Sequence, residues 1–370
     1  MQAISMRENR YGFLEPVVDL LKCVSCGACQ NACPAMHPQE ADVQPECFAA
    51  RSNDERLVKD STSGAIFTEL AKPIIRDGGV VFGCVFDAEN LIAYHKGATS
   101  LEQLEAMRGS KYVQSDMRNV IREVLEAVRQ GRKVLFTGTP CQVAAVNRVV
   151  GPCENLLTVD LICHSVPSPS LLKRYLRRLE KNAGSRVRSI KFRKKTPSWR
   201  RFHINVEYVN GQDELSQPYF ENEYYRAFLG KLRAGDACGR ESCYHCSHKS
   251  GSSGADITIG DFWGIEYVLA WNDDDRGVSA VVVHTEKGRR AFCSLESVTS
   301  VGVRYEDLVR NNQAYFKSAN CRGSRRLFQW LLRYMRPQNA DRVYAIFSMP
   351  KRILRRVVPI RVRSFLKKGN

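Results

Sequence analysis

Four cysteines near the amino terminus carry the clearest chemical pattern in this sequence. Cys23, Cys26, Cys29 and Cys33 are separated by two, two and three residues, and Pro34 follows the last of them. Thiolates are soft ligands that suit iron and sulfide, and this spacing with its closing proline is typical of iron-sulfur sites. The sequence therefore predicts a 4Fe-4S cluster in this segment.

The spacing leaves the fourth ligand of this cluster open. In proteins with two such runs, the cysteine before the proline binds the other cluster, and this sequence has no second run of the same kind. Cys33 and Cys47 are therefore alternative fourth ligands. A zinc site is the competing interpretation, although the cysteines of zinc sites usually come as separated pairs.

A second set of cysteines is dispersed along the chain. Cys141 and Cys163 each follow an apolar run, and Cys243 and Cys246 form a pair with two residues between them. A lone pair with this spacing is ambiguous among zinc, a redox disulfide and a cluster. Together the four thiols could hold a second cubane, and zinc remains the alternative.

Alternating strands and helices must position this second set. We expect strands at residues 78–87, 133–137 and 156–162, and helices at 65–75 and 116–130. Such alternation predicts an α/β fold with a mixed, largely parallel sheet, whose ligands lie beyond the carboxyl ends of the strands. Because Cys141 and Cys163 follow two of these strands, we expect both at the same edge of the sheet.

The polar residues 61–64 (Ser-Thr-Ser-Gly) precede the first of these helices. A helix amino end presents free N–H groups and can hold an anion, but an ordinary helix cap explains the same residues. A further strand at residues 12–19 is expected to lead into the amino-terminal cysteine loop.

Composition limits the possible locations and partners. The chain has 370 residues and fourteen cysteines, and no apolar leader occupies its first sixteen residues. These features predict a reducing, cytoplasmic location, where clustered cysteines bind metal more often than they pair. No run of eighteen apolar residues is present, so no membrane-spanning helix is predicted.

The net charge of +17 is concentrated in the tail. Residues 322–370 hold fourteen Lys and Arg and a single acid, Asp341, and apolar residues alternate with the basic ones. This pattern predicts a basic, helical, amphipathic tail that rests on an anionic membrane surface at the inner face of the plasma membrane. A solvated helical face and nucleic acid are the less favoured alternatives. The basic residues of 175–201 are interpreted as a solvated face.

Several motifs together resemble the coenzyme F420 hydrogenase/dehydrogenase beta subunit family, in its bacterial branch associated with polysaccharide biosynthesis. The resemblance is carried by the ferredoxin-type run at 23–34 and by the segments 108–114, 138–142, 160–164, 242–246 and 256–264. It implies an iron-sulfur flavoprotein with FAD on the α/β core and a 4Fe-4S cluster beside it. The division implied is a ferredoxin-type module at 1–48, a flavin-binding core in two parts at 49–150 and 151–320, and the tail at 321–370.

The resemblance also implies roles for individual residues. The cluster ligands would be Cys141, Cys163, Cys243 and Cys246, and the catalytic candidates are His164 and Lys111. The cofactor-binding candidates are Ser61, Thr62, Ser63, Gly64, Arg108, Ser110, Lys111, Tyr112, Gly138, Thr139, Gln142 and Asp261. Helix caps, surface charges, core packing and a hydrogen-bonded histidine are the plainer interpretations. Cys84, Cys153, Cys293 and Cys321 are expected in the core, and Cys238 has no assigned role.

The predicted function is an FAD- and iron-sulfur-dependent oxidoreductase. It would take electrons from a ferredoxin-like donor or a partner subunit and reduce or oxidise an organic substrate, such as a sugar or glycan precursor. The alternative is an electron-transfer subunit that feeds a partner enzyme or uses coenzyme F420. A zinc-stabilised scaffold is a third hypothesis.

Overall fold

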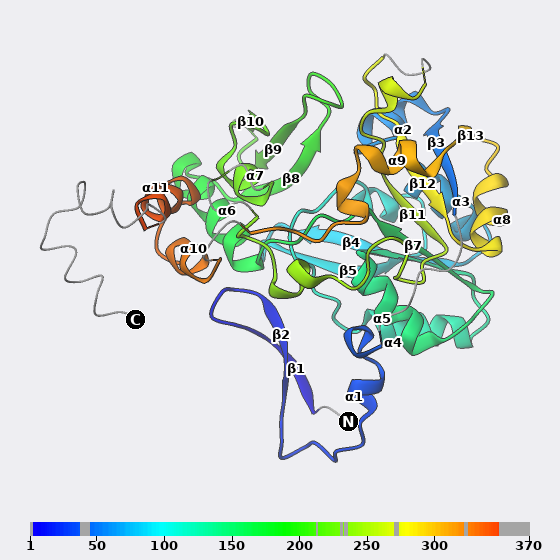
Figure 1. The fold of residues 1–370 in the computed structure, drawn as a ribbon, viewed down its shortest axis with the longest axis horizontal. Coiled ribbons are helices and arrows are strands. Elements are labelled where there is room, and N and C mark those ends of the chain that lie inside the picture. The colour runs from blue at the N-terminus through cyan, green and yellow to red at the C-terminus, as the bar shows by residue number, and fades with distance from the viewer. Residues whose placement is uncertain are drawn as a thin grey trace, which may run out of the picture.

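The computed structural model describes residues 3–37, 45–211, 214–229, 232, 236–269, 274–321 and 325–347 of the 370. Figure 1 shows a broad body built around one large sheet, with an amino-terminal hairpin and loop projecting from one side and two helices at the other end. The predicted α/β class is confirmed.

The central sheet has eight strands in the order β13-β3-β12-β11-β7-β6-β4-β5. Its four central strands, β4, β6, β7 and β11, are mutually parallel, and the outer strands pair antiparallel. The strand bounds are β3 (Glu46–Ser52), β4 (Val80–Asp87), β5 (Ile92–Ala98), β6 (Val134–Gly138), β7 (Leu156–Leu161), β11 (Ile257–Asp261), β12 (Ser279–Val283) and β13 (Val298–Val303).

The parallel strands are largely buried because helices cover both faces of the sheet. Ile66 and Leu70 of α3 (Ile66–Arg76) pack on one face with α8 (Glu286–Cys293). The other face is covered by α4 (Val120–Arg129) and α5 (Pro140–Val150). The predicted strands and helices of this region are therefore confirmed, with shifts of a few residues at their ends.

Short elements join the sheet to its surroundings. These are α2 (Glu55–Asp60), α9 (Tyr305–Arg310), η2 (Gln103–Met107), η4 (Ile265–Tyr267) and η5 (Gln313–Tyr315).

A second, antiparallel sheet lies beside the first, in the order β10-β9-β8. Its strands are β8 (Val187–Lys194), β9 (His203–Tyr208) and β10 (Glu214–Pro218), and it shares a core with α6 (Pro169–Ala183) and α7 (Glu223–Phe228). The register of β8 on β9 shifts between Lys191 and Lys194, where two residues of β8 face the single residue Ile204. This is a β-bulge, which changes the direction of the side chains it contains.

The carboxyl-terminal helices α10 (Arg325–Leu332) and α11 (Pro337–Phe347) pack on this second core. Phe328, Leu331 and Leu332 of α10 are buried, although we expected them to face a membrane, and Trp330 alone among its large apolar residues is more than half exposed. The described part of the tail thus uses its apolar face inside the protein. The rest of the predicted tail, residues 348–370, lies outside the described residues.

The amino-terminal segment is open. Strands β1 (Ile4–Glu8) and β2 (Leu14–Val18) form a hairpin, and the cysteine loop follows with α1 (Ala28–Asn31) and η1 (Pro34–Met36). The tip of the hairpin is anchored because Phe13 is buried and Gln114 hydrogen-bonds both the N–H and the carbonyl of Leu14. Among the described helices, none is both long and apolar enough to cross a bilayer.

Candidate redox site

The carboxyl ends of the central strands bring together two of the dispersed cysteines. Gly138 at the end of β6 pairs with Asp160 of β7, and the backbone N–H of Ile162 donates to Ile259 of β11 at 2.9 Å. Cys141 stands in the first turn of α5, directly after β6, and Cys163 lies two residues beyond β7. Both cysteines therefore lie at the same edge of the sheet, as the sequence predicted.

The other two cysteines reach this edge on η3 (Glu241–His245) and the residue after it. Burial raises the pKa of the Cys163 thiol, and the nearby thiols of Cys243, Cys141 and Cys246 raise it further. The four thiols are thus electrostatic neighbours. Among the described residues, no group of three or more His, Cys, Asp or Glu side chains is placed to hold a metal ion. A 4Fe-4S cluster and zinc therefore both remain predictions for these four thiols.

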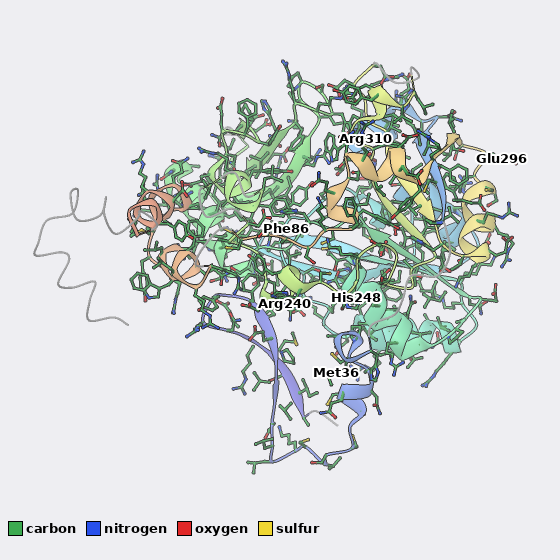
Figure 2. The ribbon with its side chains drawn as sticks, in the orientation of Figure 1. Met36, Phe86, Arg240, His248, Glu296 and Arg310 are labelled. Atoms are coloured by element: carbon green, nitrogen blue, oxygen red, sulfur yellow. The ribbon has the colours of Figure 1, made fainter. Side chains whose placement is uncertain are left out.

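Polar groups surround these thiols. The hydroxyl of Thr139 lies 3.3 Å from the sulfur of Cys141, and the backbone N–H of Val166 hydrogen-bonds the sulfur of Cys243, which favours its thiolate. The positive charge of Arg240 also favours the thiolate forms of Cys141 and Cys243. In Figure 2, Arg240 lies on the side of the body that faces the amino-terminal segment. Donors near sulfur are a main control of cluster potential.

Two of the cofactor-binding candidates, Gly138 and Gln142, have structural contacts. Gln142 accepts from the N–H of Thr139 at 3.0 Å and donates to Ser115 at 2.9 Å, which makes it a helix cap and a brace. Gly138 lies so close to Gln142 that a Cβ there would be 3.0 Å from the amide oxygen. Both residues hold the loop of Cys141 in position.

His164 follows Cys163 and is held from two sides. Its Nε2 atom lies 3.0 Å from a carboxylate oxygen of Asp236, and its ring lies edge-on to Phe228 with 5.8 Å between centroids. A third of its side chain is exposed. A histidine oriented by a carboxylate, close to solvent, can carry a proton.

The two segments predicted to bind a flavin meet in the structure. The backbone N–H of Ser110 donates to the hydroxyl of Thr62 at 3.0 Å. Ser63 donates to the carbonyl of Val278 at 2.7 Å, and Gly64 packs so tightly that a Cβ would lie 2.4 Å from the carbonyl oxygen of Ala50. Ser61 is buried. The fold thus joins residues 61–64 to residues 108–112.

Two charged candidates in this region are fully engaged. The ammonium group of Lys111 donates to the carbonyl oxygens of Ala106, Met107 and Arg108 at 2.9 to 3.0 Å, so it closes the end of η2. Burial lowers the pKa of Lys111 to about 8. Arg108 pairs with Glu105 at 2.8 Å. In this arrangement neither side chain has a free charge for catalysis. Neither is a plain surface charge, since Lys111 is half-buried and the side chain of Arg108 is 19% exposed.

Tyr112 belongs to an aromatic cluster. Its ring centroid lies 4.6 Å from that of Phe228 and 5.4 Å from that of Tyr225, and its carbonyl accepts from Tyr224 at 2.6 Å. Phe228 also contacts His164. The rings of Tyr112 and Phe228 therefore link the segment of residues 108–112 to His164 at the cysteine edge of the sheet.

Asp261, at the end of β11, has two partners that the sequence did not indicate. One oxygen accepts from Arg193 of β8, and the other accepts from the indole of Trp199 at 2.6 Å. Burial alone would lower the pKa of Arg193, but the Asp261 carboxylate raises it above its ordinary value. Arg193 was expected on a solvated face, yet its side chain is only 2% exposed. The missed signal is the bulge, which a sequence pattern of period two does not reveal.

Lys195 is a second residue that was expected on a solvated face. Its ammonium donates to the carbonyl oxygens of Ser63 and Val58, each at 2.7 Å, and to the backbone carbonyl oxygen of Arg276. Burial lowers the pKa of Lys195 to about 7, while three carbonyl acceptors match the three protons of the charged form. Lys195 therefore fixes the loop of residues 61–64.

The amino-terminal cysteines lie on the loop between β2 and η1. Cys26 and Cys29 are exposed, Cys23 and Cys33 are half-buried, and Gly27 adopts φ 71° between them. Cys47 instead lies within β3, buried in the core of the large sheet, where burial raises its pKa to about 12. This position favours Cys33 as the fourth ligand.

The remaining cysteines divide by burial. Cys293 is exposed, contrary to our expectation of a core residue, because it lies in the last turn of α8. Cys84, Cys153 and Cys321 are half-buried, and Cys238 is buried in the core beneath α10.

Comparison with known proteins gives two matching family models. Residues 131–304 match the family model for the carboxyl terminus of the coenzyme F420 hydrogenase/dehydrogenase beta subunit. Residues 15–35 match a 4Fe-4S binding domain, and this span contains all four cysteines of the amino-terminal run.

Among solved structures, the chain is similar to a chain of a xenon-derivatised F420-reducing NiFe hydrogenase complex from Methanosarcina barkeri. The TM-score is 0.48 and the sequence identity 18%, over 75% of this chain and 90% of that one. Among curated proteins no sequence matches this chain.

Proposed function

We propose that this protein is an iron-sulfur flavoprotein that passes electrons between two 4Fe-4S clusters and FAD and so reduces or oxidises an organic substrate. The convergence of Cys141, Cys163, Cys243 and Cys246 beside the His164 and Phe228 pair carries the proposal. The two family matches support iron-sulfur binding and an oxidoreductase class.

The FAD would couple the two-electron chemistry of the substrate to the one-electron steps of the clusters. Thr62, Ser110 and Tyr112 would form its binding surface, since these residues come from two segments that the fold joins. Ser63 and Gly64 hold the loop rigid through buried contacts.

His164 would hold and deliver the proton of the reaction. Asp236 fixes one ring nitrogen at 3.0 Å, and Phe228 fixes the plane of the ring. A carboxylate in this position keeps a histidine in one orientation. We propose no proton transfer for Lys111, because its three protons are engaged with carbonyl groups.

Helix α5 would connect the two clusters. Cys141 stands in its first turn, and at its other end the Nε atom of Arg148 donates to the carbonyl of Asn31 at 2.8 Å. Seven residues of helix span about 10 Å. The amino-terminal cysteine loop thus docks on the helix that carries a ligand of the second site, a short and rigid connection for electrons.

The exposed apolar residues of the amino-terminal segment support an electron-transfer partner. Leu20, Leu21 and Val24 lie beside the cysteine loop and are 82%, 99% and 63% exposed. Exposed apolar groups around a redox centre favour docking of a ferredoxin-like donor or a partner subunit. The second candidate function, an electron-transfer subunit that feeds a partner enzyme or uses coenzyme F420, rests on this surface.

The organic substrate is proposed from the family resemblance, as a sugar or glycan precursor. Residues 348–370 would then hold the protein near a membrane surface that carries lipid-linked precursors.

Anaerobic purification tests the proposed function. The protein should be brown, contain iron, acid-labile sulfide and one FAD, and lose its visible absorption with dithionite. A colourless protein that contains two equivalents of zinc and no flavin would refute the proposal. If flavin is present but the protein reduces only dyes and co-purifies with a second protein, the electron-transfer subunit is the correct function.

A further inference from the structure

The bulge in β8 places Arg193 inside the protein. Successive residues of a strand normally point to opposite faces, but Phe192 and Arg193 are both buried. The bulge allows this because both residues face the single residue Ile204 on β9. Bulges occur next to active sites, where they redirect a side chain. The buried direction of Arg193 is therefore built into the sheet.

Only one part of the Arg193 guanidinium is paired. Its Nη1 atom donates to Asp261, while Nε and Nη2 are buried and have no hydrogen-bond partner among the described residues. In a guanidinium, Nε–H and one Nη2–H point in the same direction, as a fork that matches the two oxygens of a carboxylate or phosphate. The free part of Arg193 is thus the complete two-pronged edge.

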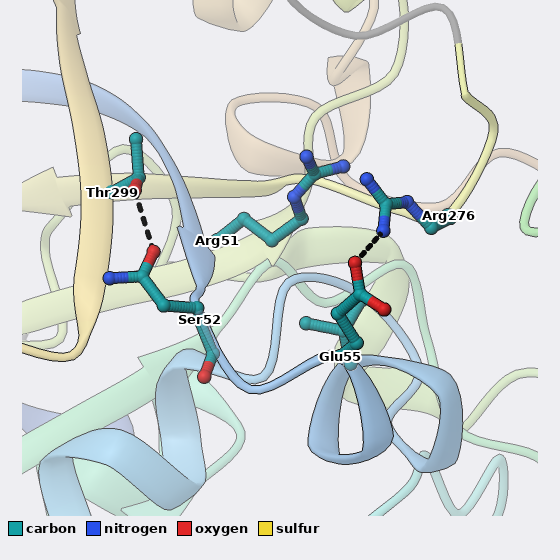
Figure 3. A pocket seen from close by; sticks show the side chains of 7 residues that line it. Arg51, Ser52, Glu55, Arg276 and Thr299 are labelled. Carbon is teal, nitrogen blue, oxygen red and sulfur yellow. Dashed lines mark hydrogen bonds and ion pairs between the residues drawn. The ribbon is translucent and has the colours of Figure 1, made fainter.

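Nearby arginines do not share this feature. Figure 3 shows Arg51 and Arg276 at a pocket of about 200 Å³, whose other lining residues include Glu55. Arg276 pairs with Glu55 at 2.7 Å, and Asp274 accepts from Arg51 at 2.8 Å. Both guanidinium groups there have acidic partners for their charge. A buried donor without an acceptor is destabilising. The fork of Arg193 differs from the other two guanidinium groups in carrying such unpaired donors.

Aromatic rings form the walls around this fork. The centre of the guanidinium lies 4.4 Å from the ring centroid of Phe202 and 5.2 Å from that of Trp263. Phe202 is buried, whereas Trp263 is partly exposed and lies on the loop after β11. Of these two rings, only that of Trp263 reaches the surface. Tyr112 and Tyr225, which belong to the aromatic cluster beside the proposed flavin-binding residues, also interact electrostatically with Arg193 and raise its pKa.

We propose that the Nε and Nη2 edge of Arg193 is an oxyanion-binding subsite that takes a carboxylate or phosphate group at the redox site. Asp261 and Trp199 hold the arginine in place, and the fork supplies both hydrogen bonds to the anion. The inference rests on the proposed function for the identity of the ligand, because the oxyanion belongs either to the organic substrate or to the diphosphate of FAD.

Calorimetric titration of the full-length protein with inorganic phosphate and with acetate tests the subsite without measuring activity. Wild type should bind one anion per chain. Arg193→Lys keeps a charge for Asp261 but loses the fork, and it should bind at least about tenfold more weakly, the loss expected of one bidentate pair. Arg188→Gln is the matched control, an exposed arginine of the same strand, and its affinity should equal that of wild type.

A parallel measurement of FAD affinity identifies the source of the oxyanion. If Arg193→Lys weakens FAD binding about tenfold and the FAD-loaded wild type binds no added anion, the diphosphate of the flavin occupies the fork. If FAD affinity is unchanged and anion binding falls, the fork takes the substrate.

The subsite is refuted if Arg193→Lys changes neither anion nor FAD affinity, or if wild type binds no anion and FAD affinity does not depend on Arg193. If the lysine variant does not fold, the double variant Arg193→Met with Asp261→Asn removes both charges together and serves the same comparison. Binding of phosphate that depends on Arg193 in a protein without iron or flavin would keep the subsite and refute the proposed function.

Discussion

The two cysteine sets of this protein are positioned in opposite ways. Cys23, Cys26, Cys29 and Cys33 lie on one short loop, so their geometry is nearly independent of the rest of the chain. Cys141, Cys163, Cys243 and Cys246 come from three separate segments, and they are electrostatic neighbours only because the fold brings η3 to the edge where β6 and β7 end. The first site depends on local spacing, and the second depends on the fold.

Exposure alone does not separate the two sets. Cys26 and Cys29 are exposed in the amino-terminal loop, but Cys141 is also exposed at the sheet edge, and the other cysteines of both sets are partly buried. The difference between the sets is therefore one of support by the fold. Perturbations of the body should therefore damage the second site and leave the first intact.

The largest effect should follow from Asp261→Ala. This substitution leaves Arg193 buried with no carboxylate and removes the acceptor of Trp199, so we expect a loss of about 3 to 5 kcal/mol in the free energy of unfolding. Denaturant unfolding of the full-length protein measures it. A loss below about 1 kcal/mol would show that the pair contributes little. Glu105→Ala, which removes an exposed ion pair to Arg108, is the control with little expected effect.

A methyl group at Gly64 should have the next largest effect. Its Cβ would lie 2.4 Å from the carbonyl oxygen of Ala50 and 2.8 Å from the N–H nitrogen of Ser279, and both are backbone atoms. We expect Gly64→Ala to cost about 1 to 3 kcal/mol and to lower the FAD content.

Gly302→Ala is the matched control for this substitution, because no described atom lies within 4 Å of a Cβ at Gly302. Unchanged thermal stability and FAD content in Gly64→Ala would mean that the loop of residues 61–64 is not rigid.

The loss of stability in acid should come from the large-sheet body of the protein. Burial lowers the pKa of His284 to about 4, so the unfolded chain takes up a proton below about pH 6.5 while the folded protein does not. The free energy of unfolding should therefore fall as the pH decreases from 6.5 to 4, by about 1.4 kcal/mol per pH unit from this residue.

Asp160, whose pKa burial raises to about 6, acts in the opposite direction, because the folded protein binds its proton first. His284→Gln should flatten the pH dependence of the thermal midpoint below pH 6.5. An identical slope in wild type and variant would contradict the neutral, buried state of His284.

The smallest effect should follow from Arg148→Ala. The hydrogen bond from Arg148 to Asn31 joins the amino-terminal loop to α5 at the surface, so its loss should change global stability by less than about 1 kcal/mol. Amide hydrogen exchange should become faster at residues 28–37 and remain unchanged in β6 and β7. If exchange is unchanged in both regions, the loop is held by other contacts.

The sequence predicted the elements that position the second site, because apolar strands between two helical layers give a strong signal. It also predicted that Cys141 and Cys163 would meet, since both follow such strands. It did not predict the buried roles of Arg193 and Lys195, because neither a bulge nor three carbonyl acceptors can be read from residue type. The tail was misjudged in part, since an amphipathic pattern such as that of α10 does not indicate whether protein or membrane covers its apolar face.

Iron and acid-labile sulfide analysis of Cys26→Ser and Cys163→Ser beside wild type tests the central claim most directly. Two separate clusters predict that each substitution removes about four irons and a different electron paramagnetic resonance signal of the dithionite-reduced protein. If Cys163→Ser keeps the full iron content of wild type, the cysteines at the sheet edge hold no cluster, and the claim of two clusters is wrong.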